Sequence, residues 1–131
     1  MKPNQDMIRT PSVTEDQEKV GMMIFKKLEN VIVSEKLFLK PKLSREEVMR
    51  IAYIPKNKFA AIFTKNAGMN FTKYVNELRL EYACQVLKEH PEYTIEGVAK
   101  ECGIPVVQTF YRLFFEKFGQ TPTKYRKTLA D

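Results

Sequence analysis

One pattern occurs twice in this sequence, and it restricts the fold more than any other feature. Superimposing Ser44 on Thr94 gives an offset of 50, and the same offset pairs Val48 with Val98, Tyr53 with Gly103 and Ile54 with Ile104. One extra residue then makes the offset 51, which pairs Phe59, Ile62, Phe63 and Gly68 with Phe110, Leu113, Phe114 and Gly119. Each copy predicts a capped helix, a tight turn and a second helix. Neither copy is large enough to bury its own apolar face, so both must pack against other helices.

The rest of the chain also favours an all-α fold. Helical periodicity dominates from Thr14 onward, and no stretch shows the sustained alternation of a strand. Thr14 with Gln17 has the form of a capping box and predicts a first helix. Its apolar face is expected to carry Val20, Met23, Ile24, Lys27, Leu28 and Val31. In the first copy of the repeat, Val48, Ile51 and Ala52 are expected to point inward, and Phe and Tyr residues at helical spacing are interpreted as core.

The longest predicted helix lies between the two copies, with Asn70 as its cap and Glu89 near its end. Its apolar residues form two stripes, one through Phe71, Tyr74, Val75, Leu78 and Tyr82, the other through Leu80, Ala83, Cys84 and Leu87. A helix that is apolar on two sides is normally packed between two bodies. The expected fold has about seven helices, with two helix-turn-helix subdomains (14–69 and 91–131) joined by a connecting helix (70–90). Residues 1–13 have no period and are predicted to be a flexible leader or linker.

Charge and composition favour a nucleic-acid partner over a membrane. The formal net charge is +6, which favours a polyanionic ligand. The sequence contains neither an apolar run long enough to span a bilayer nor a secretory signal, so no membrane contact and a cytoplasmic location are expected. Cys84 and Cys102 lack metal-ligand or CxxC spacing and are interpreted as reduced thiols. No catalytic set can be assembled around His90, the single histidine, so the chain is not expected to be an enzyme or to need a cofactor or metal.

The duplicated pattern suggests a geometry for binding double-stranded DNA. The second helix of such a unit can enter the major groove while the first contacts the backbone, and two units on one rigid helix could reach groove segments about 34 Å apart. A plain helical bundle has capped helices and short turns as well. The repeat and its surrounding lysines and arginines favour the DNA interpretation.

Three segments then resemble a known family. They are residues 70–83 (NFTKYVNELRLEYA), 94–99 (TIEGVA) and 119–126 (GQTPTKYR). Together they resemble the DNA-binding module of the AraC/XylS family of bacterial transcription regulators, over about Asp16 to Thr128. The resemblance implies a seven-helix module whose third and sixth helices, here about 55–66 and 106–118, read DNA in successive major-groove segments.

The resemblance also implies site residues. Carried over by position, the base-reading residues are Lys56, Asn57, Lys58, Ala60 and Ala61 in the first unit and Val107, Gln108, Thr109, Tyr111 and Arg112 in the second. The phosphate contacts are Ser44, Lys65, Thr94 and Lys124. Arg79 is expected to fix the connecting helix and not to touch DNA.

Several residues depart from the family pattern. Tyr53 stands at a turn position where the family usually has Gly, so this turn must accept a positive φ at a cost of roughly 1 kcal/mol or adopt another shape. Met49 replaces a small residue, Ala61 and Thr64 replace basic residues, Phe115 replaces a lysine and Ile104 a phenylalanine. The second unit is therefore the stronger candidate for specificity.

The sequence is compatible with two functions. The first is sequence-specific regulation of transcription, and the alternative is a degenerate helix-turn-helix module that binds another regulator or RNA polymerase. The expected partners are double-stranded DNA, RNA polymerase and a sensor or dimerisation region of a longer parent protein. A short regulator controlled by its own abundance is the alternative to such a parent.

Overall fold

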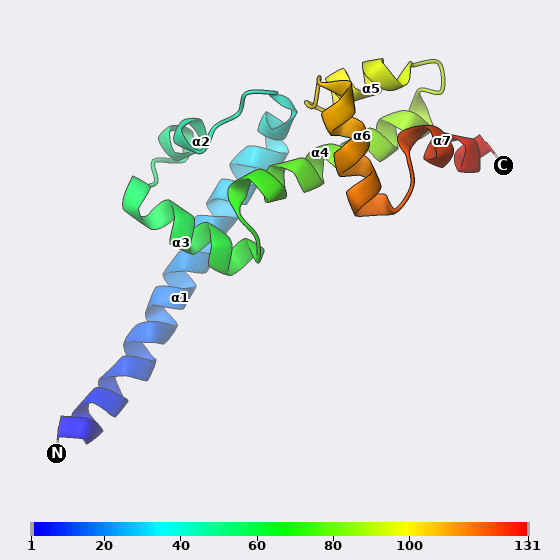
Figure 1. Ribbon diagram of the computed structural model, residues 1–131. Helices are drawn as coiled ribbons and strands as arrows, with labels where there is room; N and C mark the ends of the chain where they lie inside the picture. The colour runs from blue at the N-terminus through cyan, green and yellow to red at the C-terminus, as the bar shows by residue number, and fades with distance from the viewer. Residues whose placement is uncertain (1, 131) are drawn as a thin grey trace.

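The computed structural model describes the backbone of residues 2–130 and the side chains of residues 15–130. Within these limits the chain forms seven α-helices and no strand, as the sequence predicted (Figure 1). The helices are α1 (Lys2–Ser34), α2 (Arg45–Ala52), α3 (Lys56–Ala67), α4 (Phe71–Glu89), α5 (Ile95–Glu101), α6 (Val107–Phe118) and α7 (Pro122–Ala130), with a 3₁₀ turn, η1 (Leu37–Leu39), after α1. No helix in this part of the chain has both the length and the apolar character needed to cross a membrane.

Helix α4 lies between two hydrophobic cores. The first core joins α1, η1, α2 and α3 to the first half of α4, and includes Phe25, Leu28, Phe59 and Phe63. The second core joins the other half of α4 to α5, α6 and α7, with Phe110 and Phe114 fully buried. Tyr82 packs against both cores. The two apolar stripes of α4 thus serve the two cores, which confirms the expectation of a doubly apolar connecting helix (Figure 1).

Three predicted helix caps are present. The side chains of Ser44, Asn70 and Thr94 accept hydrogen bonds from the backbone N–H groups of Glu47, Lys73 and Gly97. Each cap satisfies one backbone donor in the first turn of its helix, which fixes where α2, α4 and α5 begin. The two thiols are also free, as expected, and burial raises the pKa of Cys102 to about 12.

Two predicted apolar faces were only partly right. Leu28 in α1 and both Val48 and Ala52 in α2 are buried as predicted, whereas the predicted residue Lys27 of α1 is exposed. In α1 the buried residues are Phe25, Leu28 and Ile32, whereas Val20 and Met23 are exposed. Helix α1 carries apolar residues on several sides, and it also extends well beyond α3, so contact with α2 and α3 selects a face that periodicity alone did not identify (Figure 1). In α2, Met49 is buried and Ile51 is exposed. Either residue shares a side of the helix with Val48 and Ala52, so the packing of α2 against α1 and α3 selects Met49.

The backbone of α1 begins at Lys2, further toward the N-terminus than Thr14, where the capping box predicted the first helix to begin. The side chains of residues 1–14 lie outside the described part of the chain. The assignment of residues 1–13 to a flexible leader or linker therefore stays a prediction, as do the exact subdomain limits.

In the turn of the first unit, a residue other than glycine adopts the left-handed backbone conformation. Tyr53 has φ 58° and ψ 43°, whereas Gly103 in the second unit has φ 92°. Of the two alternatives for this turn, the chain therefore adopts the positive φ. The Tyr53 side chain is 86% exposed, with Lys27 Nζ 5.9 Å from the ring centroid, so little packing offsets the strain.

Replacing Tyr53 with glycine should therefore raise the free energy of unfolding by about 0.5–1 kcal/mol, since glycine adopts this conformation without a Cβ clash. Denaturant unfolding measures the change. Tyr53→Ala is the matched control, because it removes the ring and keeps the strained Cβ. An equal gain in both variants would mean that the ring, and not the backbone, carries the cost.

Candidate nucleic-acid interface

Two helix-turn-helix units form the frame of the candidate interface. In the first unit the turn between α2 and α3 is closed by Ile54 N–H, which donates to Met49 O at 3.0 Å. In the second unit Ile104 N–H donates to Ala99 O at 2.9 Å across the turn between α5 and α6. The same bond thus recurs at the repeat offset of 50, and it closes the turn between the two helices of each unit.

The second helix of the second unit presents its polar residues outward. Gln108 and Arg112 are exposed, and Arg112 Nη1 lies 3.3 Å from Glu116 Oε1 on the next turn. Tyr111 is half-buried, and its hydroxyl hydrogen-bonds to Thr123 Oγ1 of α7 at 3.1 Å. Val107 and Thr109 are partly buried. Gln108 and Arg112 are therefore the two exposed residues of the set predicted for this second unit, and Arg112 pairs with Glu116.

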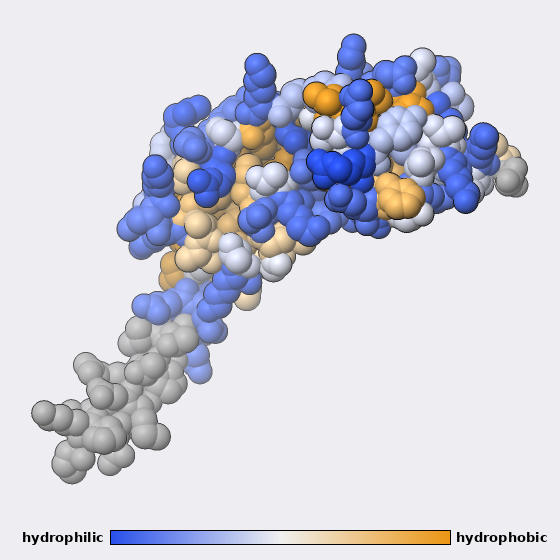
Figure 2. All heavy atoms as spheres, in the orientation of Figure 1, coloured by the Kyte–Doolittle hydropathy of each residue, from blue (hydrophilic) through white to orange (hydrophobic). Residues whose placement is uncertain are grey.

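The corresponding helix of the first unit presents two lysines, one asparagine and two alanines. All five predicted base readers are exposed on α3: Lys56, Asn57, Lys58, Ala60 and Ala61. Three of these residues, Asn57, Lys58 and Ala61, also line a groove of about 490 Å³ between α3 and α1. The α1 wall of this groove includes Val20 and Ile24. Hydrophobic residues reach the visible face over the α1–α3 region, and again over the α5–α6 region (Figure 2).

The predicted phosphate contacts lie at helix ends. Ser44 and Thr94 are the N-caps of α2 and α5, so their hydroxyl oxygens are already used by the helix and only the hydroxyl hydrogens remain free. Lys124 is exposed in the first turn of α7. Lys65 Nζ lies 3.2 Å from Glu18 Oε1 of α1 in an ion pair whose two side chains are 62% and 50% exposed. Such an exposed pair contributes little and can be exchanged for a phosphate.

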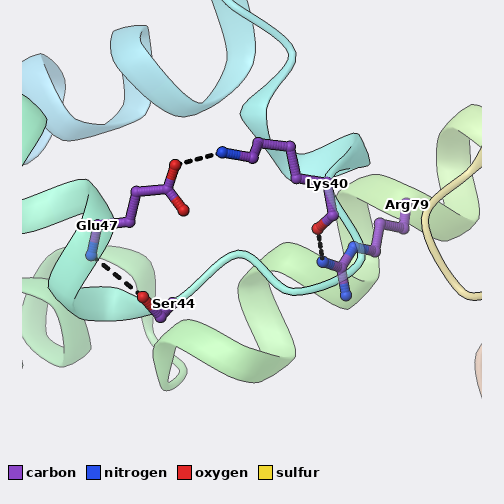
Figure 3. Close-up of polar contacts among 4 residues, drawn as sticks. All are labelled: Lys40, Ser44, Glu47 and Arg79. Carbon is purple, nitrogen blue, oxygen red and sulfur yellow. Dashed lines mark hydrogen bonds and ion pairs between the residues drawn. The ribbon is translucent and has the colours of Figure 1, made fainter.

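Arg79 of α4 fixes the entry to the first unit, as expected. Its Nε donates to Phe38 O at 2.6 Å and its Nη2 to Lys40 O at 2.7 Å, while Nη1 donates to Asn76 Oδ1 at 3.2 Å. The Lys40 ammonium in turn pairs with Glu47, whose N–H is bound by the Ser44 cap (Figure 3). Burial lowers the pKa of the Arg79 guanidinium. A chain of polar contacts thus runs from α4 to the beginning of α2.

A second set of charges joins α4 to α6, and sequence analysis did not identify it. Lys117 of α6 pairs with Glu77 of α4 and lies 4.0 Å from Glu81 Oε1. Burial acts to raise the pKa of the Glu77 carboxyl, but hydrogen bonds and charges from Lys117 and Lys73 outweigh it and hold the pKa below its usual value. Lys117 is 40 positions from Glu77 and 36 from Glu81 in the chain, so helical spacing gives no signal for these two contacts.

Phe115 of α6 is an aromatic residue that lies outside the core. Phe115 is 55% exposed, because Phe110, Leu113 and Phe114 occupy the side of α6 that faces α4 and α5. Its place on the outward side of α6 follows from its spacing of three and seven residues from Arg112 and Gln108.

Comparison with known proteins agrees with this architecture. The family model for a helix-turn-helix domain matches residues 48–128, which include the first unit from the middle of α2 onward and the whole second unit. The uncharacterized HTH-type transcriptional regulator YijO of Escherichia coli is 34% identical over 65% of this chain and 30% of its own length. The probable transcriptional regulator LumQ of Photobacterium leiognathi is 27% identical over 93% of this chain and 48% of its own length. The chain therefore spans less than half of these relatives.

Among solved structures, the DNA-binding domain of AdpA, a global transcriptional factor determined in complex with a target DNA, superimposes with a TM-score of 0.68. The match covers 80% of this chain and 90% of that domain, at 18% identity, and it shows a shared fold. With the match to the family model and the duplicated turn geometry, these comparisons establish that the chain belongs to the AraC-type helix-turn-helix family of bacterial transcription regulators.

Proposed function

We propose that this domain binds double-stranded DNA with sequence specificity and thereby regulates bacterial transcription. The observation that carries the proposal is the exposed pair Gln108 and Arg112 on the second helix of a helix-turn-helix unit. The net charge of +6 favours the same ligand. The domain acts by binding and not by catalysis, in the cytoplasm where bacterial DNA lies.

The base-reading roles follow from side-chain chemistry. Arg112 can bind the O6 and N7 atoms of guanine with two hydrogen bonds, and Gln108 can bind the N6 and N7 atoms of adenine. In the first unit Asn57 has the same adenine chemistry, with Lys56 and Lys58 beside it. Ala60 and Ala61 are short, and they would allow α3 to approach the bases closely. Val107, Thr109 and Tyr111 complete the contact of α6, where Thr109 suits a thymine methyl group or a base edge.

The phosphate-binding roles belong to Ser44, Lys65, Thr94 and Lys124. All four lie at or near helix ends, and the N-termini of α2 and α5 would approach the DNA backbone when α3 and α6 enter the groove. These contacts orient the protein and add affinity without distinguishing one sequence from another.

The proposal extends to partners outside this chain. The aligned segment is 30% of YijO and 48% of LumQ, which supports a longer parent protein with a sensor or dimerisation region. RNA polymerase is the proposed protein partner of the DNA-bound domain.

Substitution of Arg112 or Gln108 by alanine should relax base discrimination at particular positions of the bound site. A good bidentate contact distinguishes its base by about 1–3 kcal/mol, so the preference at one base pair should fall roughly 5- to 150-fold. Competition binding with singly substituted duplexes measures this. Arg126→Ala provides the control, as an arginine of α7 outside the recognition helix. An unchanged site preference in both recognition-helix variants would contradict the assignment of base reading to Arg112 and Gln108.

Lys65→Gln should behave differently, because a phosphate contact carries no base information. We expect weaker binding to every duplex and a salt slope, log K against log salt concentration, that is shallower by about 0.9. Glu18→Gln is the matched control, since it releases Lys65 from its ion pair and should leave the slope unchanged or steeper. A sequence-dependent loss in Lys65→Gln would contradict the assignment.

A second candidate function is binding to another protein. It is favoured by three exposed apolar side chains on α1, those of Val20, Met22 and Met23, and by the groove beside them. Binding to duplex DNA that is weak, unselective and nearly independent of salt would favour this candidate over the first.

A further inference from the structure

Phe115 is a large apolar side chain on the most outward side of α6. It is 55% exposed, although the buried side of the same helix already holds Phe110 and Phe114 at zero exposure. The core of the second unit is therefore complete without Phe115, and its ring contributes little to folding.

Phe115 shares one helical face with the two predicted base readers. Gln108, Tyr111, Arg112 and Phe115 follow one another at positions i, i+3, i+4 and i+7. This is the spacing with which a recognition helix presents four side chains to base edges in a major groove. Along the helix axis the four residues span about 10.5 Å, which corresponds to roughly three base-pair steps.

An aromatic side chain in this position can make an apolar contact with one kind of base edge in particular. The major-groove edge of thymine carries a C5-methyl group, which is the only apolar group that the four bases present there. Guanine and adenine would instead place polar atoms against the ring, and those atoms would lose water without gaining a hydrogen bond. Cytosine has only a C5–H where thymine carries its methyl group, beside a polar amino group. The corresponding residue of the first unit is Thr64, at the repeat offset of 51, and it also carries a methyl group.

We propose that Phe115 is a specificity-determining residue that packs against the C5-methyl group of a thymine, one to two base pairs from the base bound by Arg112. The inference rests on the proposed DNA-binding function. It assigns to the second unit a combined preference for guanine, through hydrogen bonds, and for thymine, through apolar contact.

Deoxyuridine tests the proposal directly, because it differs from thymidine only by the missing methyl group. The preferred duplex is first selected from a random library with the wild-type chain, and each thymine is then replaced singly by deoxyuridine. At one position near the Arg112 contact, the wild-type affinity should fall about fourfold, as expected for loss of one buried methyl group. The Phe115→Ala variant should bind the thymine and deoxyuridine duplexes equally.

Leu129→Ala serves as the matched control, since Leu129 is a partly exposed apolar residue on α7, and this variant should keep the fourfold difference. A thermal melt confirms that each variant is folded. If Phe115→Ala retains the fourfold difference, or if no thymine methyl group affects wild-type binding, the inference is wrong while DNA binding stands. If the library yields no preferred duplex, the proposed function itself fails, and the role of Phe115 fails with it.

Discussion

Replacing Arg79 with methionine is expected to lower the free energy of unfolding by about 3–5 kcal/mol. The guanidinium donates to the carbonyl oxygens of Phe38 and Lys40, and methionine would leave the buried Phe38 oxygen and the partly buried Lys40 oxygen without their charged partner. The melting temperature should fall on the order of 10–20 °C, because each kcal/mol corresponds to about 4 °C for a domain of this size. Chemical and thermal unfolding both measure the effect.

The control for this prediction is Arg45→Met, which removes an exposed arginine at the beginning of α2. It should change the free energy of unfolding by no more than about 0.5 kcal/mol. A loss below 1 kcal/mol in Arg79→Met would mean that solvent replaces the guanidinium easily, and that α4 does not fix the segment between η1 and α2.

Gly103→Ala is expected to cost about 2–4 kcal/mol. Two separate effects add at this position. Gly103 has φ 92°, which is strained for any residue with a Cβ, and a Cβ built there would lie 2.9 Å from the backbone oxygen of Leu39 and 3.1 Å from Arg79 Nε. The backbone oxygen cannot move away as the tip of a flexible side chain could, so the turn of the second unit must separate from the η1 segment of the first.

Gly119→Ala separates the two effects. Gly119 has φ 73°, yet a Cβ there would meet nothing within 4 Å, so this variant measures the backbone strain alone, at about 1 kcal/mol. Equal losses in the two variants would show that the protein accommodates a Cβ near the Leu39 oxygen without added cost.

Local signals in the sequence predicted most of the fold. The caps Ser44, Asn70 and Thr94 and the end of α3 at Gly68 depend on interactions within one turn of helix, so they could be identified without tertiary information. The two stripes of α4 were predictable for the same reason, because a rigid helix of 19 residues maps its sequence directly onto its faces.

The remaining features depend on contacts between distant segments. Phe25 and Ile32 of α1 are buried because of where α2 and α3 pack, and the meeting of Gly103 with Leu39 joins residues 64 positions apart. Phe115 lies outside the spacing of Phe110, Leu113 and Phe114, which fill the core side of α6. Periodicity gives the faces of a helix, whereas packing decides which face is covered.

For the candidate interface, the sequence predicted most of the residues that lie outward on α3 and α6. Lys56, Asn57, Lys58, Gln108 and Arg112 are all exposed, because the buried positions of both helices follow the same pattern of phenylalanines. The hydrogen bond between Tyr111 and Thr123 was not predictable, since it depends on how α7 folds back on α6. The DNA contacts themselves stay proposals.

The measurement that tests the central claim most directly is selection of this domain on a random duplex library, with the recovered duplexes retested across a salt series. Two enriched elements about one helical turn apart, with an affinity that falls steeply as salt is raised, are the predicted result. Absence of any enriched sequence, together with weak and nearly salt-independent binding, would contradict the claim.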